Sequence, residues 1–332
     1  VYSVQPQPLD GGDRGEMTNQ ICANNVSGTN QAFPGYGTWL ASVGLSGAGV
    51  RIANVDSGLQ DSHPALASRV IPCVGGADCG TASSQSSHGT HTAGIMAADP
   101  NGSPLDAYGF KRAMGVAPGA NLIEQLYSPT YTQTNGMLKL MYTSRYNNCS
   151  LSGNSWGPSG SPLGYDNNTR QVDVGTRDAD PNTPGNQPLL FVLSIMNGNG
   201  GTSTQGTPDE AKNIFTIGST KGQTTGGVQI LQIDDLSSNS AHGPCLDGRK
   251  IPHMVAPGCY VDSSTTTSSF GLLCGTSMAS PHVSGAVALF IEYYRGLPDY
   301  NADPSPALIK AAFCAVGTVS YTHLTLPTIY SV

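Results

Sequence analysis

The sequence predicts an α/β protein in which a mostly parallel central sheet is covered by helices on both faces. Short apolar runs typical of buried strands recur at four places: 50–55, 121–126, 189–196 and 213–217. Helical patterns alternate with them at 89–98, 136–146 and 168–179. Strands that alternate with helices form parallel crossover units, so a single sheet with two covered faces is expected. Such sheets carry their functional side chains at the carboxyl ends of the strands.

Composition limits the partners of this 332-residue chain. Charged residues make up only 11%, whereas glycine (42) and proline (23) are plentiful, which favours a compact, loop-rich globular protein. The formal net charge of -7 and the lack of any run of lysine or arginine exclude nucleic acid and an anionic membrane as expected partners. No apolar stretch approaches the ~20 residues that span a bilayer. We expect a monomer.

The pattern of residues divides the chain into three parts. Residues 1–47 are polar and rich in glycine, asparagine and proline, so we interpret them as an extended lead-in with one short helix at 37–43. Residues 48–319 form the main domain, without an internal repeat or a linker. A helix is expected at 306–316, and the tail at 320–332 looks unrelated to what precedes it, so no function is assigned to it.

The cysteines favour disulfides and an extracellular location. There are eight of them, without a CxxC pair or the cysteine and histidine spacing of a zinc site. Cys73 and Cys79 bracket a short loop and form the best candidate pair, while the other pairings stay open. Some of the eight could instead be buried free thiols. Disulfides persist in oxidising compartments, so we expect a secreted protein.

Three segments carry the parts of an activated nucleophile. Asp56 follows a buried strand, His88 stands at the start of a helix, and Ser277 stands at the mouth of a long apolar helix that runs to about residue 294. A carboxylate, an imidazole and a hydroxyl together can activate a serine. Taken singly, Asp56 could be a turn cap, His88 a surface histidine and Ser277 a helix N-cap.

The residues around these three positions resemble the three signature motifs of the subtilase family of serine proteases. They read Val-Asp-Ser-Gly, His-Gly-Thr-His-x-Ala-Gly and Gly-Thr-Ser-Met-Ala-x-Pro-His-Val, and their order along the chain is Asp, His, Ser. The stretches at 115–118, 154–158, 239–244 and 255–258 extend the likeness over about residues 48–318. The resemblance implies the three-layer subtilisin-like α/β fold and a secreted endopeptidase that acts on protein or peptide substrates.

The resemblance also implies roles for particular residues. Ser277 attacks the peptide carbonyl, His88 accepts the proton from Ser277 and passes it to the leaving amine, and Asp56 orients the imidazole. The segment Ser155, Trp156 and Gly157 is similar to the family's strand that pairs with substrate backbone. His91 and His282 belong to the family motifs, and we expect structural roles for both.

Two asparagines compete for the role of side-chain donor to the oxyanion. The family places this asparagine after Ala-Gly at the end of a buried strand, and here both Asn197 and Asn199 follow the strand at 189–196. Asn197 fits the strand length and is favoured, whereas Asn199 has the better glycine neighbours. If Asn197 is correct, Ile195 and Met196 replace small residues that line the family's specificity pocket.

Neither a cofactor nor a metal is expected for catalysis. The family often has a calcium-ligating acid after its His-Pro pair, but here His63 and Pro64 are followed by Ala65. The loop 99–106 could hold structural calcium through its oxygens, although its spacing is not that of a calcium loop, and a solvated acidic loop is favoured. Two other functions are alternatives: a subtilase scaffold that binds peptides without cutting them, and a lipase. A lipase would need Gly-x-Ser-x-Gly, but Ala279 stands where the second glycine would be.

Overall fold

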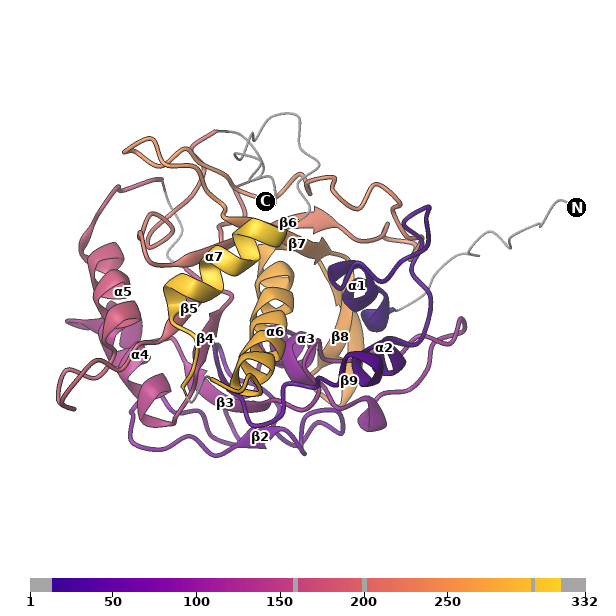
Figure 1. Cartoon of the computed structure of the whole chain (residues 1–332), viewed down its shortest axis with the longest axis horizontal. Coiled ribbons are helices and arrows are strands. Elements are labelled where there is room, and N and C mark those ends of the chain that lie inside the picture. Colours follow the sequence, from indigo (N-terminus) through magenta and orange to yellow (C-terminus); the bar gives the residue numbers. More distant parts are fainter. Residues whose placement is uncertain (1–13, 158–160, 199–201, 300–301, 318–332) are drawn as a thin grey trace, which may run out of the picture.

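The computed structural model describes residues 14–157, 161–198, 202–299 and 302–317. Its centre is a parallel sheet of seven strands in the order β2-β3-β1-β4-β5-β6-β7 (Figure 1). The strands are β1 (Arg51–Asp56), β2 (Val70–Ile71), β3 (Asn121–Leu126), β4 (Leu151–Asn154), β5 (Leu190–Ser194), β6 (Phe215–Lys221) and β7 (Met254–Cys259). The predicted fold class is therefore confirmed.

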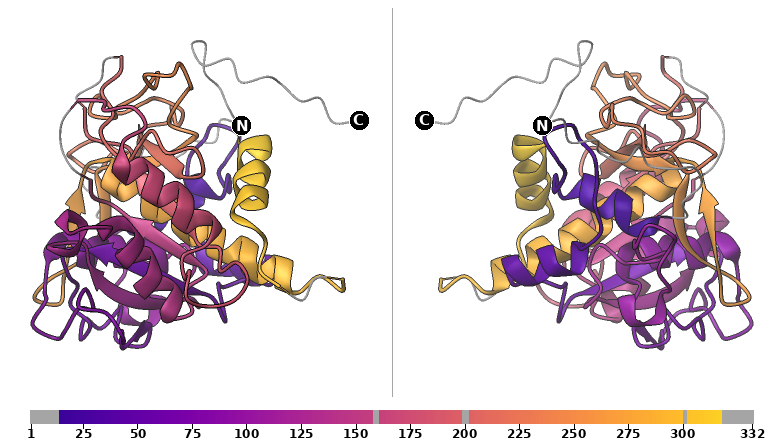
Figure 2. Two further views of the ribbon diagram at one scale, coloured as in Figure 1. Left: turned by 90° about the vertical axis from the view of Figure 1, so that its left-hand side faces the viewer. Right: turned by 90° about the vertical axis from the view of Figure 1, so that its right-hand side faces the viewer.

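Two hydrophobic cores, one on each face, hold this sheet between helices. Alternate strand residues point to opposite faces, so that Ile52 and Leu122 enter one core while Ala53 and Ile123 enter the other. The first core packs on α3 (Ser87–Ala97) and α6 (Thr276–Arg295), and the second on α4 (Gly136–Tyr146) and α5 (Asn167–Arg177). The side views in Figure 2 show the resulting layers.

Smaller elements complete the described chain. An antiparallel hairpin of β8 (Val261–Thr265) and β9 (Ser269–Leu273) precedes α6, and α7 (Pro306–Val316) follows it. Two short 3-10 helices span Pro100–Gly102 and Thr130–Thr132. The sequence did not predict β7, whose Pro257 and Gly258 are unusual within a strand, nor the hairpin after it. Within the described chain, no helix has the length and apolar character needed to cross a membrane.

The lead-in segment is more structured than expected. It contains α1 (Gly15–Cys22) as well as the predicted helix, α2 (Tyr36–Val43). Helix α1 is almost wholly buried, and the polar residues on it are used: Thr18 bonds His282 at 2.8 Å, and Asn19 donates to the Met114 carbonyl at 2.6 Å. An amphipathic pattern could not reveal a helix that buries polar residues along with Met17 and Ile21. The boundaries at 47/48 and 319/320 stay predictions, and the tail at 320–332 lies outside the described residues.

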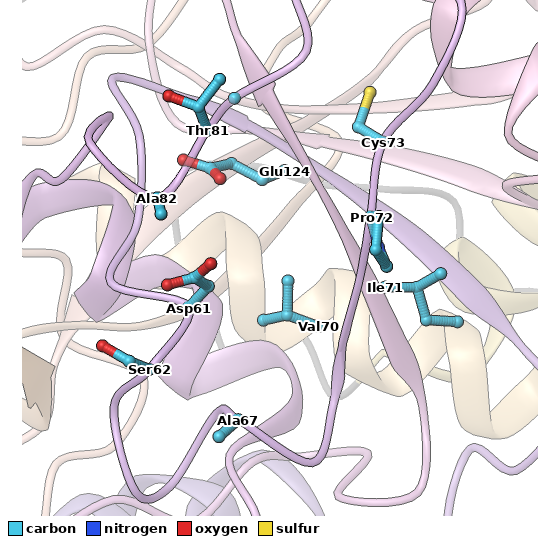
Figure 3. Close-up of a pocket in the computed structure, with 11 residues that line it drawn as sticks. Asp61, Ser62, Ala67, Val70, Ile71, Pro72, Cys73, Thr81, Ala82 and Glu124 are labelled. Atoms are coloured by element: carbon cyan, nitrogen blue, oxygen red, sulfur yellow. The ribbon is translucent and has the colours of Figure 1, made fainter.

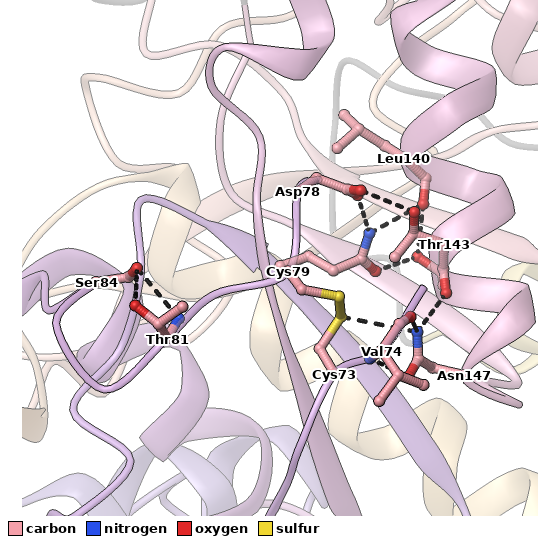
Figure 4. Close-up of a disulfide and its surroundings, with 11 residues drawn as sticks. Cys73, Val74, Asp78, Cys79, Thr81, Ser84, Leu140, Thr143 and Asn147 are labelled. Atoms are coloured by element: carbon pink, nitrogen blue, oxygen red, sulfur yellow. Dashed lines mark hydrogen bonds between the residues drawn. A yellow bond between two sulfur atoms is a disulfide. The ribbon is translucent and has the colours of Figure 1, made fainter. Parts of the chain in front are cut away.

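Two disulfides fasten loops to this frame. The predicted pair Cys73–Cys79 is confirmed, with an S–S distance of 2.06 Å. Within its loop, Asp78 accepts hydrogen bonds from Gln125 (2.7 Å) and Thr143 (2.8 Å), which holds the loop on β3 and α4 (Figure 4). The second disulfide joins Cys259 to Cys274. Four cysteines are free thiols in the structure: Cys22, Cys149, Cys245 and Cys314.

Candidate active site

Asp56 is the last residue of β1 and is 1% exposed. Its carboxylate lies beside the His88 ring, with Nδ1 2.8 Å from Oδ1 and 3.0 Å from Oδ2. The backbone N–H and hydroxyl of Ser57 donate to Oδ1, and the Thr92 hydroxyl donates to Oδ2 at 3.3 Å. These donors, together with His88, fix the position of the carboxylate.

His88 is presented by the first turn of α3, which packs tightly against the loop after β1. A Cβ at Gly89 would lie 1.9 Å from the Gly58 oxygen, so only glycine lets the helix approach so closely. Burial lowers the pKa of His88, but the hydrogen bond and the negative charge of Asp56 outweigh burial and raise the pKa above its usual 6.5. The side chain is still 38% exposed, so the imidazole can meet a substrate from solvent.

Ser277 is the second residue of α6 and is hydrogen-bonded to Ser155, the residue that follows β4. Its hydroxyl donates to the Ser155 carbonyl at 3.1 Å, and the Ser155 hydroxyl donates to the Ser277 carbonyl at 2.9 Å. That carbonyl has no backbone partner within the helix, because residue 281 is a proline and lacks an N–H, so it can accept from Ser155. In the described residues, Ser277 makes no hydrogen bond to His88, so its hydroxyl must rotate away from Ser155 before it can react.

Asn197 lies against the segment that precedes the serine. Its side-chain carbonyl accepts from the N–H of Thr276 at 3.0 Å and from the Thr276 hydroxyl at 3.1 Å. The side-chain carbonyl takes both of these bonds, which leaves the Nδ2 donor available. The competing residue, Asn199, lies outside the described residues. Strands β1, β4 and β5 are neighbours, and Asp56, Ser155 and Asn197 stand at or just beyond their carboxyl ends.

The segment expected to contact substrate runs along the same edge. Ser155 is buried, Trp156 is half-buried and Gly157 is exposed. The Trp156 ring stacks on Tyr127 with 4.7 Å between centroids, and Tyr131 packs against both rings. The Tyr127 N–H donates to the Asp56 carbonyl at 3.0 Å, so this aromatic group is attached directly to the strand end that carries Asp56.

His91 and His282 both make internal bonds, as expected of structural residues. His91 Nε2 lies 3.0 Å from the carbonyls of Val261 and Gly271, which joins α3 to the hairpin. His282 bonds Met278 within α6 and Thr18 of α1. Burial lowers the pKa of each to about 4, so both rings are neutral near pH 7.

Two buried carboxylates support the loops of the site, and neither was singled out from the sequence. Asp209 is 2% exposed and accepts from the N–H groups of Gly206 (2.8 Å) and Met196 (3.4 Å), which are the two ends of the loop that contains Asn197. Burial raises the pKa of Asp209 to about 7 against the effect of these donors, and the nearby charge of Glu210 adds to the rise. Asp209 directly follows Pro208, and nothing in the sequence around it indicated a buried acid.

Glu124 of β3 has the corresponding position under the loop after Asp56. Its carboxylate accepts from the Leu59 N–H at 2.9 Å, and burial raises its pKa to about 7, with a further contribution from the charge of Asp61. Glu124 and Asp61 line a cavity of about 380 Å³ between β2, β3 and the segment 80–82 (Figure 3). Its other walls are largely apolar, including Val70 and Ile71, and the triad residues do not line it.

The acids of the loop 99–106 are already used inside the protein. Asp99 pairs with Arg69 at 3.4 Å and accepts from Ser68, while Asp106 accepts from two backbone N–H groups and pairs with Arg14. Acids neutralised by arginine fit a calcium ion poorly. Nowhere in the described ranges do three or more histidine, cysteine or acidic side chains gather as a metal site would require.

Comparisons with known proteins identify one family and its fold. The model of the Subtilase family matches residues 47–314. Thermitase of Thermoactinomyces vulgaris is 30% identical, over 77% of this chain and 80% of that protein. Subtilisin E of Bacillus subtilis (strain 168) is 29% identical, over 76% of this chain but only 58% of its own length. Among solved structures, S41 Psychrophilic Protease has a TM-score of 0.63 at 20% identity and covers 93% of this chain and 90% of its own.

Proposed function

The chain belongs to the subtilase family of serine endopeptidases, and on that premise we propose that it cuts peptide bonds with Ser277 as nucleophile, His88 as general base and Asp56 as the group that orients the base. The observation that carries the proposal is the bonded pair of Asp56 and His88 at the same sheet edge as the Ser277–Ser155 contact. Attack by Ser277 forms an acyl-enzyme and releases the amine, and water then hydrolyses the acyl-enzyme.

Asn197 is proposed as the side-chain donor to the oxyanion. The contact of its carbonyl with Thr276 supports this role, because it fixes the amide one residue from Ser277 and leaves Nδ2 as a donor. The backbone N–H of Ser277 would be the second donor. The segment Ser155, Trp156 and Gly157, which passes from buried to exposed, is proposed to pair with the substrate backbone. A monomeric, secreted enzyme without a cofactor is the simplest form of the proposal, and the two disulfides support secretion.

A fluorophosphonate probe together with a mixed peptide library tests this function. The probe should label Ser277, and mass spectrometry should find cleaved peptides. Ser277→Ala should lose both labelling and about 10⁶-fold in kcat while its folded structure persists. Labelling without any cleavage would instead favour a scaffold that only binds peptides, and cleavage within about tenfold of the parent by Ser277→Ala would refute the nucleophile.

A further inference from the structure

The Cys259–Cys274 disulfide lies at the junction between the sheet and α6, and its Cys274 is three residues before Ser277. Cys259 is the last residue of β7, and Cys274 follows β9 directly. The S–S distance is 2.03 Å. Next to the disulfide, the Gly275 N–H donates to the Gly258 carbonyl at 2.8 Å, so a covalent link and a hydrogen bond join the same two segments.

The segment 274–276 also contacts the proposed oxyanion residue. Thr276 supplies both bonds to the Asn197 carbonyl, and a Cβ at Gly275 would lie 3.2 Å from Asn197 Nδ2. A shift of this segment would therefore move the nucleophile and the oxyanion donor together. The approach of the two backbones is close, because a Cβ at Gly258 would lie 2.6 Å from the Gly275 oxygen.

Other contacts hold the neighbouring elements without help from the disulfide. The apolar side of α6 is buried in the core through residues such as Val283, Val287 and Ile291. The hairpin keeps its own ladder of five paired positions and its bonds to His91. Loss of the cross-link would leave these elements folded, and the freedom gained would be confined to the few residues that lead into Ser277.

We propose that the Cys259–Cys274 disulfide is a positioning element for catalysis, which holds residues 274–276 so that Ser277 and Asn197 act on the same carbonyl. This proposal rests on the proposed function. Cys274 is exposed and Cys259 is half-buried, so a reductant in solvent can reach the bond. A dithiol such as dithiothreitol delivers two electrons and two protons, which gives two cysteine thiols and the cyclic oxidised dithiol.

The other disulfide provides a matched control. The experiment compares the parent with the double variants Cys259→Ser/Cys274→Ser and Cys73→Ser/Cys79→Ser, each with and without dithiothreitol. Circular dichroism and thiol counting by mass spectrometry establish folding and reduction, and kcat, KM and the fluorophosphonate labelling rate are measured. The reduced parent provides a second route to the same state if the double variant fails to fold.

Small displacements of catalytic groups cost about 10- to 100-fold in rate, so we expect that fall in kcat and in labelling rate for Cys259→Ser/Cys274→Ser, with little change in KM. Dithiothreitol should cause the same fall in the parent and in Cys73→Ser/Cys79→Ser, and no further fall in Cys259→Ser/Cys274→Ser. If the folded variant or the reduced parent labels and cleaves as fast as the untreated parent, the proposal is wrong. A parent that is never labelled would instead refute the proposed function.

Discussion

Replacement of Asp209 by asparagine should change how the stability of this protein depends on pH. The pKa of the buried carboxyl is raised from 3.8 to about 7, so the folded state holds the proton more tightly than the unfolded chain does. The free energy of unfolding therefore falls as pH rises from about 4 to about 7 and levels off above that range. Three pKa units at about 1.4 kcal/mol each set a ceiling of about 4 kcal/mol for this loss.

Asparagine resembles the protonated acid and keeps one oxygen for the Gly206 and Met196 N–H groups. The Asp209→Asn variant should thus match its parent near pH 4 and exceed the parent's unfolding free energy at pH 8. Because the new NH2 group requires an acceptor of its own, we expect a gain of about 1–3 kcal/mol rather than the ceiling. Urea unfolding across pH 4 to 8, with both proteins carrying Ser277→Ala to prevent self-cleavage, measures the difference.

Asp247 serves as the control because its pKa is shifted in the opposite direction. It is exposed, and its hydrogen bond with Arg249 lowers its pKa. Asp247→Asn should therefore give a variant that is slightly less stable than its parent above pH 4, not more stable. A stability difference for Asp209→Asn that stays constant from pH 4 to pH 8 would show that burial of this charge does not destabilise the fold, and the reasoning would fail.

Three further outcomes are expected for the chemistry. Asp56 raises the pKa of His88, so kcat/KM of the free enzyme should rise with pH through a limb above 6.5. Asp56→Asn should move that limb to lower pH. A limb below pH 5 in the parent would exclude His88 as base. Asn197→Ala should lose about 10² to 10³ in kcat with little change in KM, and a mild effect would transfer the oxyanion role to Asn199. Met278 directly follows Ser277, so its oxidation to a polar sulfoxide should displace the nucleophile, and mild peroxide should lower kcat more than the melting temperature. Met278→Leu should resist peroxide, and equal inactivation of that variant would place the lesion elsewhere.

Local patterns in the sequence were sufficient for much of the fold. The apolar runs that predicted β1, β3, β5 and β6 are strands whose side chains are buried on both faces, and such strands are recognisable without knowledge of their neighbours. By contrast, the buried polar residues of α1 and the glycine and proline of β7 carry no local signal. Their structure depends on partners far along the chain, such as His282 for Thr18.

The same division applies to the site. The sequence alone determined which residue types could perform nucleophilic catalysis, because Asp56, His88 and Ser277 stand in short motifs where local backbone demands glycine neighbours. Only the tertiary structure decided which groups support them. These groups include the Cys259–Cys274 link, the two bonds from Thr276 to Asn197 and the buried acids Glu124 and Asp209, and each contact joins residues between 13 and 79 positions apart in sequence. Hydrogen bonds and cross-links of this kind require atoms within a few ångströms of each other, and chain folding rather than sequence spacing brings them to that distance.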